Sequence, residues 1–422
     1  MKRLFFIIFV LLSFITQTIA EPGTHPVFSR LTYSDIFGLI GLMFGINILF
    51  TGFVSASKIS SIYKMALLLI LCFFLPLFFS FNIESTIIEC LILLFLILLS
   101  VMLFQHFKDH LLDILFPVLI YTLLIASFLG FYDLAADPIG LPRLFPKRVD
   151  GEALSGFRNA GQAGAYFLVM LSILIPLRFS KLYRYLSRSN RIALSITFVL
   201  SLIFLFLTGK IAAYAGLLTG VVFYLLYKRN IKALIAVTVG IVLLALVWNN
   251  LETLMPQTFE RVSYKFDARV VQNVNNESDN DFIQENFGAA FVAFEDRPFI
   301  GSGIGAFHGV YSTHEVHSTY LKMLGETGLI GTMGYILFMI FLLRLFKIGK
   351  YKKENPFSDY IMTMLPFLLG CLLSWSYTYH LRKREFWIMV SVLVIANYCA
   401  KNYNKWRFEE LQKNTNQLLE RD

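Results

Sequence analysis

The stretch STYLKMLGETGLIGTMGYILFMIFLL, residues 318–343, decides the fold of this chain. Its second half carries no charge, and the whole run is long enough to cross a hydrocarbon core of about 30 Å as a helix. A polar segment rich in charge and glycine, from Glu295 to His317, comes directly before it. A polar residue at such a junction can meet both water and a lipid-borne molecule, so we look for chemistry there.

Similar apolar runs recur along the whole chain. Of its 422 residues 57% are hydrophobic and only 15% are charged, against roughly 25% charged in soluble proteins. Only helices and closed barrels span lipid, and these runs do not alternate as barrel strands do. We therefore predict an all-α polytopic membrane protein built as one bundle. The predicted spans are residues 4–20, 33–51, 65–81, 85–104, 111–131, 160–177, 192–208, 211–227, 233–249, 318–343, 360–379 and 386–400.

The first span is ambiguous, because its basic start, apolar run and Thr18-Ile-Ala20 resemble a cleavable signal peptide. We favour a retained first helix, which gives about twelve spans, or about eleven if residues 1–20 are cleaved. The predicted parts are a first helix with a short loop, spans two to nine, a long exported loop, spans ten to twelve and a tail. Their boundaries are 1–32, 33–249, 250–317, 318–400 and 401–422.

The orientation follows from the basic residues. Most of the 37 Lys and Arg residues lie in short loops between apolar runs, with the densest group between Arg178 and Arg191, and such loops stay in the cytoplasm. This places the tail 401–422 in the cytoplasm and the segments 132–159 and 250–317 on the exported side. The second segment should hold short helices over the mouth of the bundle. The net charge of +9 therefore does not indicate nucleic acid.

Glycines mark the polar junction. Residues 301–306, GSGIGA, match a dinucleotide-binding pattern, but a membrane span follows instead of a soluble strand–helix unit, which argues against a nucleotide. Three glycines in five residues would instead let a tight loop pass close to another backbone or to a ligand. Gly325, Gly328 and Gly331 would let neighbouring helices approach closely.

The motifs of metal and nucleotide enzymes are missing from the sequence. It has no P-loop, no H-E-x-x-H and no paired metal-ligand spacing. All cysteines lie within apolar runs, as expected of small buried side chains without disulfides. They are Cys72, Cys90, Cys371 and Cys399. The sequence therefore predicts neither a metal nor another cofactor.

His317 opens the tenth predicted span. It is either an interfacial histidine that caps a helix or a general base for an acceptor hydroxyl, because an ordinary histidine has a pKa near 6.5. His308 and His314 are competitors for the second role. Glu326 follows Lys322 by four residues, so a helix ion pair is the simpler interpretation of that carboxylate.

Cations from several exported segments share one predicted membrane face. Arg158 and Asn159 open the sixth span, Arg148 lies shortly before them, and Lys210 occupies a tight turn between spans seven and eight. The segment 382–384, Arg-Lys-Arg, breaks the positive-inside trend in the last exported loop. These side chains are either ordinary loop and snorkelling charges or a clamp for an anion such as a pyrophosphate.

Three segments together resemble a known family. Residues 156–166 are similar to a G-x-F-x-N segment, and residues 207–218 to an L-T-x-S-R-G turn. Residues 296–331 are similar to D-x-P-x-x-G-x-G followed by H-[NS]-x-x-L-x-x-x-x-E-x-G-x-x-G. Over about 150–345 the chain resembles the O-antigen ligase and polymerase family, glycosyltransferases of the bacterial inner membrane that serve lipopolysaccharide and polysaccharide synthesis.

The resemblance implies a GT-C-like bundle with one long periplasmic loop. It also implies metal-independent, inverting transfer of a glycan from undecaprenyl pyrophosphate at the periplasmic face. The acceptor would be a lipid A-core sugar for a ligase, or the next lipid-linked repeat unit for a polymerase. By this match His317 is the catalytic residue. The candidates for binding pyrophosphate are Arg158, Lys210, Arg297, Arg148 and Arg261. The candidates for structural or substrate-positioning roles are Asn159, Gly301, Gly303 and Glu326.

The chain departs from the family pattern in places. The arginine of the S-R-G turn would fall at Ile211, so Lys210 is its candidate substitute, although lysine lacks the bidentate fork. No arginine lies in 281–287, where the family often has one, and the candidates to replace it are Arg261, Arg269 and Arg297. Neither exported loop has the R-x10-G spacing of many polymerases, which favours a ligase.

A transporter or flippase for an anionic lipid or glycan is the alternative from another class. Such proteins place ionisable groups near the middle of their spans. Here Glu89 is the main interior charge and the others gather at one face, which favours an enzyme.

Overall fold

The computed structural model describes most of the chain. The described residues are 2–19, 31–59, 61–145, 153–229, 250–253, 256–267, 287–307, 309–312, 316–350 and 354–404, with isolated positions between 235 and 248. Within these ranges every regular element is a helix, and the one extended pairing is an isolated bridge between Thr18 and Thr32.

Nine helical segments in the described ranges are long and apolar enough to cross a membrane. They are α2 (Tyr33–Ile59), α3 (Ile62–Phe74) with η1 (Leu75–Phe79), α4 (Ile83–Phe107), η2 (Leu111–Leu115) with α5 (Phe116–Ile139), α6 (Ala160–Phe179), α7 (Arg188–Leu207), α8 (Ile211–Lys228), α14 (Thr319–Arg344) with η6 (Leu345–Lys350), and α15 (Pro356–Ser374). The prediction of an all-α polytopic membrane protein is confirmed. The predicted span 233–249 lies largely outside the described residues.

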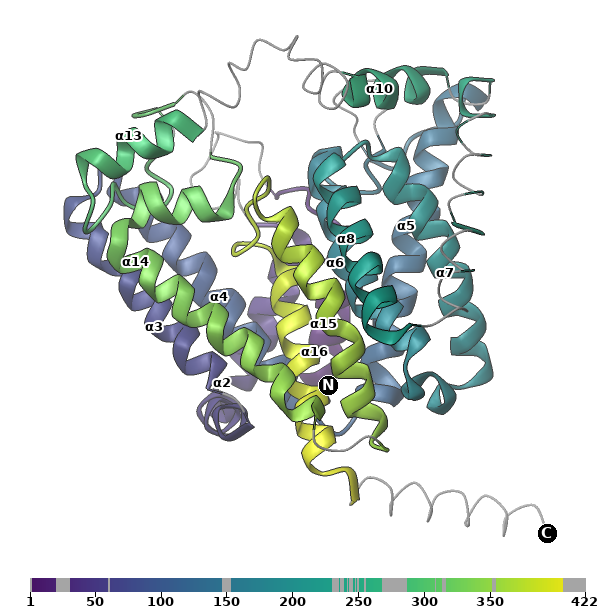
Figure 1. Cartoon of the computed structure of the whole chain (residues 1–422), viewed down its shortest axis with the longest axis horizontal. Helices are drawn as coiled ribbons and strands as arrows, with labels where there is room; N and C mark the ends of the chain where they lie inside the picture. The colour runs from purple at the N-terminus through teal and green to yellow at the C-terminus, as the bar shows by residue number, and fades with distance from the viewer. Residues whose placement is uncertain are drawn as a thin grey trace.

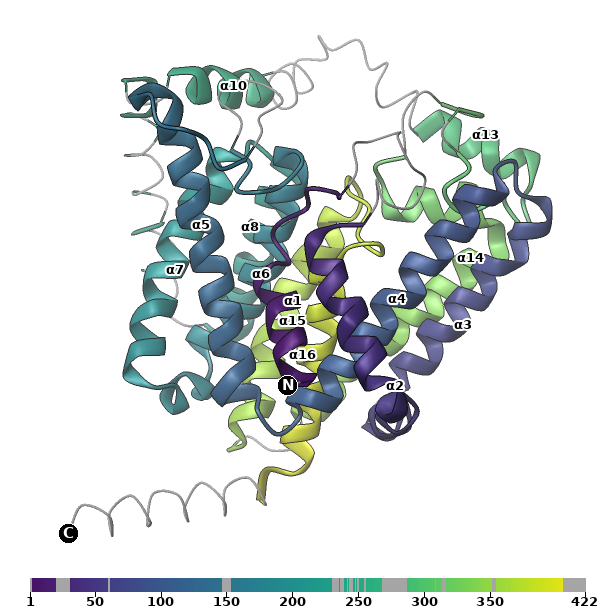
Figure 2. The ribbon, with the colours of Figure 1, turned by 180° about the vertical axis from the view of Figure 1, so that it is seen from behind.

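The helices form two groups on either side of a central pair. α15 and α16 (Arg384–Lys401) lie in the middle (Figure 1). α2, α3, α4 and α14 lie to one side, and α5, α6, α7 and α8 lie to the other, as the reverse view in Figure 2 also shows. Nearly all side chains of α16 are buried, because this helix is surrounded by others instead of lipid.

The first helix is shorter than the predicted span 4–20. α1 (Lys2–Leu11) ends before a run of hydroxyl and amide side chains that hold the following backbone elsewhere. The amide of Thr16 donates to the carbonyl of Gly156 at 3.1 Å, and its hydroxyl donates to Gln162 at 3.1 Å. Phe6 and Phe9 are buried in the core.

α8 and α15 pack at backbone distance. A Cβ on Gly216 would lie 2.8 Å from the carbonyl oxygen of Gly370, and one on Gly220 would lie 3.0 Å from the Cα of Phe367. Small residues one turn apart allow such close helix contact in membranes. The pairing of these positions shows that the two helices run antiparallel.

One end of the bundle carries most of the candidate residues. Here α2, α4, α6, α8, α14 and α16 begin, and we call it the polar end. The described part of the predicted long loop adds two short helices at this end, α10 (Pro256–Phe266) and α13 (Ala289–Asp296) (Figure 1). The short helices expected in that loop are therefore confirmed. The opposite end is tied by an ion pair between Lys228 and Asp359, at 2.7 Å.

Candidate functional site

His317 is exposed at the polar end, immediately before α14. The N-cap of α14 is the next residue, Ser318, whose hydroxyl accepts a hydrogen bond from the amide of Leu321 at 3.3 Å. The interpretation of His317 as a helix cap is therefore wrong. An exposed imidazole at this position can take a proton from a hydroxyl group that approaches it.

α14 is broken at its tenth residue. Gly328 has φ 59° and ψ −161°, which no helical residue adopts. The segment 298–303 fills the break. The amide of Leu329 donates to the carbonyl of Pro298 at 2.8 Å, and the amide of Gly303 donates to the carbonyl of Glu326 at 2.9 Å. Breaks at membrane depth are tolerated where protein groups satisfy the freed backbone in this way.

The glycine-rich loop owes its path to this contact. Gly301 and Gly303 have φ of 80° and 100°, a left-handed region that glycine occupies without steric cost. A Cβ on Gly301 would overlap the carbonyl of Glu326, and one on Gly303 would overlap the side chain of Ser80. The prediction that this loop passes close to another backbone is confirmed. The further role of these glycines in positioning a substrate stays a prediction.

The three glycines early in α14 differ in what they contact. A Cβ on Gly325 would lie 3.0 Å from the carbonyl oxygen of Ala290 in α13, and Gly328 faces the loop 298–303. Gly325 allows close approach of a neighbouring helix, as predicted, whereas Gly328 allows close approach of a loop. At Gly331 the nearest atoms to an added Cβ belong to Thr327 of its own helix, so the expectation that it admits a neighbouring helix stays a prediction.

Glu326 lies at the centre of a buried polar cluster. Its carboxylate is 3.6 Å from the Lys322 ammonium, and both side chains are fully buried, which confirms the predicted helix pair. Its Oε2 also accepts a hydrogen bond from the amide of Gly305 at 2.8 Å. The Lys322 ammonium lies 4.5 Å from the ring centroid of Tyr379. Glu326 therefore joins the glycine loop to the segment that follows α15.

Arg297 anchors the same loop from the other side. Its guanidinium stacks 4.0 Å from the ring centroid of Phe81 and donates to the carbonyl of Phe79. Nearby, burial and the Asp296 carboxylate raise the pKa of Tyr311 to about 12, so its hydroxyl stays protonated at neutral pH. These contacts give Arg297 a structural role, and its predicted role in pyrophosphate binding stays a prediction.

A second group of candidates surrounds the start of α6. Asn159 is the N-cap, and its side-chain oxygen accepts from the amide of Gln162 at 2.8 Å. The Arg158 guanidinium donates to the hydroxyl of Thr18 at 3.4 Å. The Lys210 ammonium lies 3.8 Å from where a Cβ of Gly161 would be. Two cations therefore lie beside the positive end of the α6 dipole, an arrangement that favours an anion.

The remaining candidates are less closely placed. Arg261 is partly buried in α10, above α5 and α8 in Figure 1. Arg148 and the competing histidines His308 and His314 lie outside the described residues. Figure 1 thus separates the candidates into a group at α13 and α14 and a group at α6, α8 and α10.

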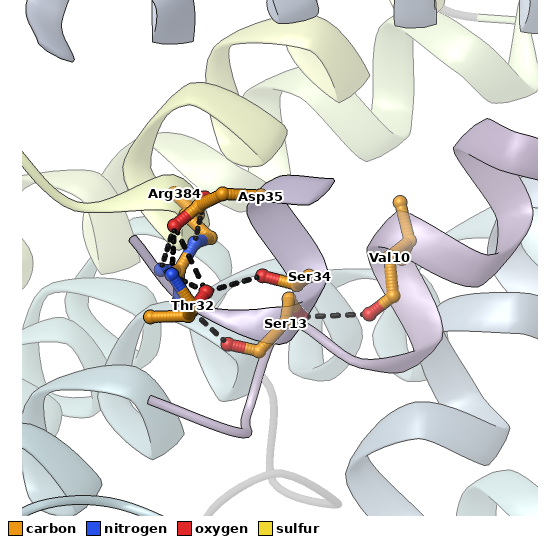
Figure 3. Close-up of polar contacts among 6 residues, drawn as sticks. All are labelled: Val10, Ser13, Thr32, Ser34, Asp35 and Arg384. Carbon is orange, nitrogen blue, oxygen red and sulfur yellow. Dashed lines mark hydrogen bonds and ion pairs between the residues drawn. The ribbon is translucent and has the colours of Figure 1, made fainter. Parts of the chain in front are cut away.

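Two of the three cations in segment 382–384 have internal partners. Arg384 forms a bidentate ion pair with Asp35, with both N–O distances at 2.8 Å, and also donates to the hydroxyl of Thr32 at 2.7 Å (Figure 3). Arg382 lies 2.5 Å from the carboxylate of Glu89. These pairs explain why cations are tolerated here against the positive-inside trend. The sequence signal was an acidic residue early in each of two spans.

The loop 375–383 connects the two groups of candidates. Two residues after His317, the amide of Thr319 donates to the carbonyl of Trp375 at 2.9 Å, and its hydroxyl accepts from the amide of His380 at 3.3 Å. Burial, and then the charges of Lys383 and Lys210, lower the pKa of His380 well below its ordinary value. His380 is therefore neutral at physiological pH. Sequence reasoning missed this histidine, because only the fold brings it near Lys210.

We also looked for metal-binding clusters and surface depressions away from the polar end. In the described part of the chain no group of three His, Cys, Asp or Glu side chains is arranged to hold a metal ion. A shallow depression of about 400 Å³ lies at the start of α7, between Tyr183, Arg188 and Ile192. It lies at the end opposite the polar end and contains none of the candidate residues.

These features define a polytopic helical membrane protein with a polar, cation-rich site at one end of its bundle. Residues 196–336, about a third of the chain, match the family model described as O-antigen ligase. This match supports the resemblance to the O-antigen ligase and polymerase family that the sequence motifs indicated. The match includes Lys210, Arg261, Arg297, His317 and Glu326. A search of curated proteins gives no match.

Proposed function

We propose that this protein transfers a glycan from a polyprenyl pyrophosphate, undecaprenyl pyrophosphate in bacteria, to an acceptor hydroxyl at the periplasmic face of the inner membrane. The acceptor oxygen attacks the anomeric carbon, the bond from that carbon to the pyrophosphate breaks, and the hydroxyl proton passes to His317. The lipid pyrophosphate leaves as the second product. Direct displacement of this kind inverts the configuration and needs no metal.

One observation carries the proposal: His317 is exposed at the start of α14, and Thr319 ties that start to the loop 375–383 by donating one hydrogen bond to it and accepting another from it. The charge of Lys210 reaches the same loop, where it helps to lower the pKa of His380. A base and a cation therefore lie on either side of one short loop. Sugar transfer needs a base at the acceptor and cations at the departing pyrophosphate.

Within this function we propose the ligase reaction, with a lipid A-core sugar as the acceptor. The absence of the R-x10-G spacing from both predicted periplasmic loops supports a ligase over a polymerase. The placement of the charges supports an enzyme over a transporter. Glu89 lies in the second turn of α4 and Lys322 in the first turn of α14, both at the polar end and paired with other residues.

The surface polysaccharide of a deletion strain tests the proposal. If the protein is the ligase, the strain accumulates polymer on the carrier lipid and leaves the lipid A-core bare. Core that carries a single repeat unit would identify a polymerase. Repeat units trapped in the cytoplasm would identify a flippase and contradict the transferase proposal.

A further inference from the structure

Lys383 differs from the two arginines beside it. Arg382 and Arg384 are neutralised by Glu89 and Asp35, whereas the Lys383 ammonium makes no ion pair within 4 Å to any carboxylate of the described residues. Its side chain is partly exposed at the polar end. Burial lowers its pKa; the Glu385 carboxylate opposes this shift, and the Arg382 charge adds to it. A partly exposed cation that forms no direct ion pair and lies near other cations is suited to binding an anion.

Unused hydrogen-bonding groups lie next to Lys383. The amide of Lys383 donates to the carbonyl of His380 at 2.9 Å, so the two residues share one turn. His380 is fully buried, and neither ring nitrogen has a hydrogen-bond partner in the described structure. Its ring stacks on Trp375 with centroids 5.5 Å apart, and the indole nitrogen of Trp375 is likewise unpartnered. Buried polar groups are normally satisfied, so this cluster indicates a ligand.

The packing of α8 on α15 brings Lys210 to the same level. The antiparallel pairing places Gly216 opposite Gly370, so Lys210, six residues before Gly216, lies level with the residues that follow Ser374. Lys210 is also the N-cap of α8. The start of this helix adds unpaired backbone amides and the positive end of its dipole. Both sides of the loop 375–383 thus favour negative charge.

We propose that Lys383 and His380 bind the diphosphate of the lipid-linked donor, and that with Lys210 they complete a site between the start of α8 and the loop 375–383. This inference rests on the proposed function and assigns the place of its leaving group. Lys383 is the outer, accessible member of the site. His380 is the inner member, where a neutral imidazole can donate one N–H to a phosphate oxygen. Lys383 would supply the charge-assisted contact that Arg382 and Arg384, already paired, do not.

Binding by the purified protein in lipid nanodiscs tests the proposal. The probes are polyprenyl pyrophosphate and inorganic pyrophosphate, and the variants are Lys383→Gln and Lys401→Gln. Lys401 is exposed at the far end of the same helix, α16, so the control removes the same charge at the opposite end. We expect Lys383→Gln to weaken binding of the lipid probe at least tenfold, and Lys401→Gln to change it less than twofold.

The two probes separate the sources of the phosphate group. Equal weakening for both probes shows that the diphosphate alone is recognised. Weakening for the lipid probe only shows that recognition requires the lipid-borne donor. Unchanged affinity of Lys383→Gln for both probes overturns the proposal.

A second variant separates ligand binding from packing. His380→Phe keeps a ring against Trp375 but removes both nitrogens. We expect it to remain folded, as judged by its melting temperature, and to bind the lipid probe several-fold more weakly. Normal binding would show that His380 only packs and would remove it from the site.

The binding experiment can fail independently of the proposed glycan transfer. If the wild-type protein binds the probe through Lys383 but transfers no glycan, the site stands and the transferase proposal fails. If transfer occurs while Lys383→Gln binds normally, the function stands and the site fails. Should Lys383→Gln not fold, acetylation of Lys383 in the wild-type protein gives the answer, because the probe should protect it from the reagent and leave Lys401 reactive.

Discussion

Gly328 has a backbone conformation that only glycine adopts readily, because its φ is 59° and its ψ is −161°. Its amide and Cα face the loop 298–303, and an added Cβ would lie 2.7 Å from the nitrogen of Gly301. The break in α14 and the path of the glycine loop therefore depend on one another. Through this pair of segments Gly328 stabilises the helix start that presents His317.

Gly328→Ala should destabilise the protein. Backbone strain at such a position costs about 1–3 kcal/mol, and the overlap with the loop adds to it. We expect a clearly lower melting temperature in detergent and a loss of transfer. Gly288→Ala is the matched control, because a Cβ there meets nothing within 4 Å. Equal melting temperatures for the two variants would show that the break is not required.

At the residue scale, the sequence predicted local contacts better than contacts between residues far apart in the chain. The positions of Gly301 and Glu326 followed from local spacing, since glycine clusters and i,i+4 pairs are local features. His380 could not be found in this way, and Lys383 stood out only as one of the three cations of segment 382–384. Their roles depend on α8, α15 and the loop 375–383 meeting at one end, and nothing in the local sequence encodes that meeting.

At the scale of elements, the ion pair of Arg384 with Asp35 couples α16 to α2. Both side chains are largely buried, at 13% and 8% exposed. The Arg384 guanidinium also approaches the carbonyl of Ser13, beyond the end of α1, at 3.5 Å (Figure 3). The starts of two helices and the end of a third are thus held at one point, beside the loop that carries His380.

Removing one partner of this pair should cost more than removing both. Asp35→Leu or Arg384→Met leaves a buried charge uncompensated, which costs about 3–5 kcal/mol, whereas a double replacement with apolar residues is often close to neutral. We expect Asp35→Leu with Arg384→Met to melt above either single variant. Additive losses in thermal unfolding would contradict a coupled pair.

The elements themselves were well predicted, because apolar runs of sufficient length have few alternatives in lipid. The exceptions have physical reasons. α1 ends at Leu11 because the hydroxyl and amide groups that follow bond to the start of α6. The break at Gly328 was hidden because the apolar run continues through it, and only the loop 298–303 satisfies the freed backbone groups.

At the scale of the whole molecule, the proposed function requires the polar end to face the periplasm. Tyr377 is 56% exposed in the loop 375–383, and Lys401 is exposed at the other end of α16. In a background with Cys72, the one partly exposed cysteine, replaced by serine, Tyr377→Cys should react with a membrane-impermeant maleimide in cells whose inner membrane is intact. Lys401→Cys should react only after that membrane is opened. The reverse pattern would invert the topology.

The central claim is that this bundle transfers a glycan with His317 as the base. The most direct measurement is transfer by the purified protein in proteoliposomes, from a labelled glycan on polyprenyl pyrophosphate to a lipid A-core acceptor, comparing wild type with His317→Ala at equal membrane levels. We expect transfer with release of polyprenyl pyrophosphate by the wild type, and a loss of at least a hundredfold in the variant, in the range of general base catalysis. Transfer at the wild-type rate by His317→Ala would contradict this claim.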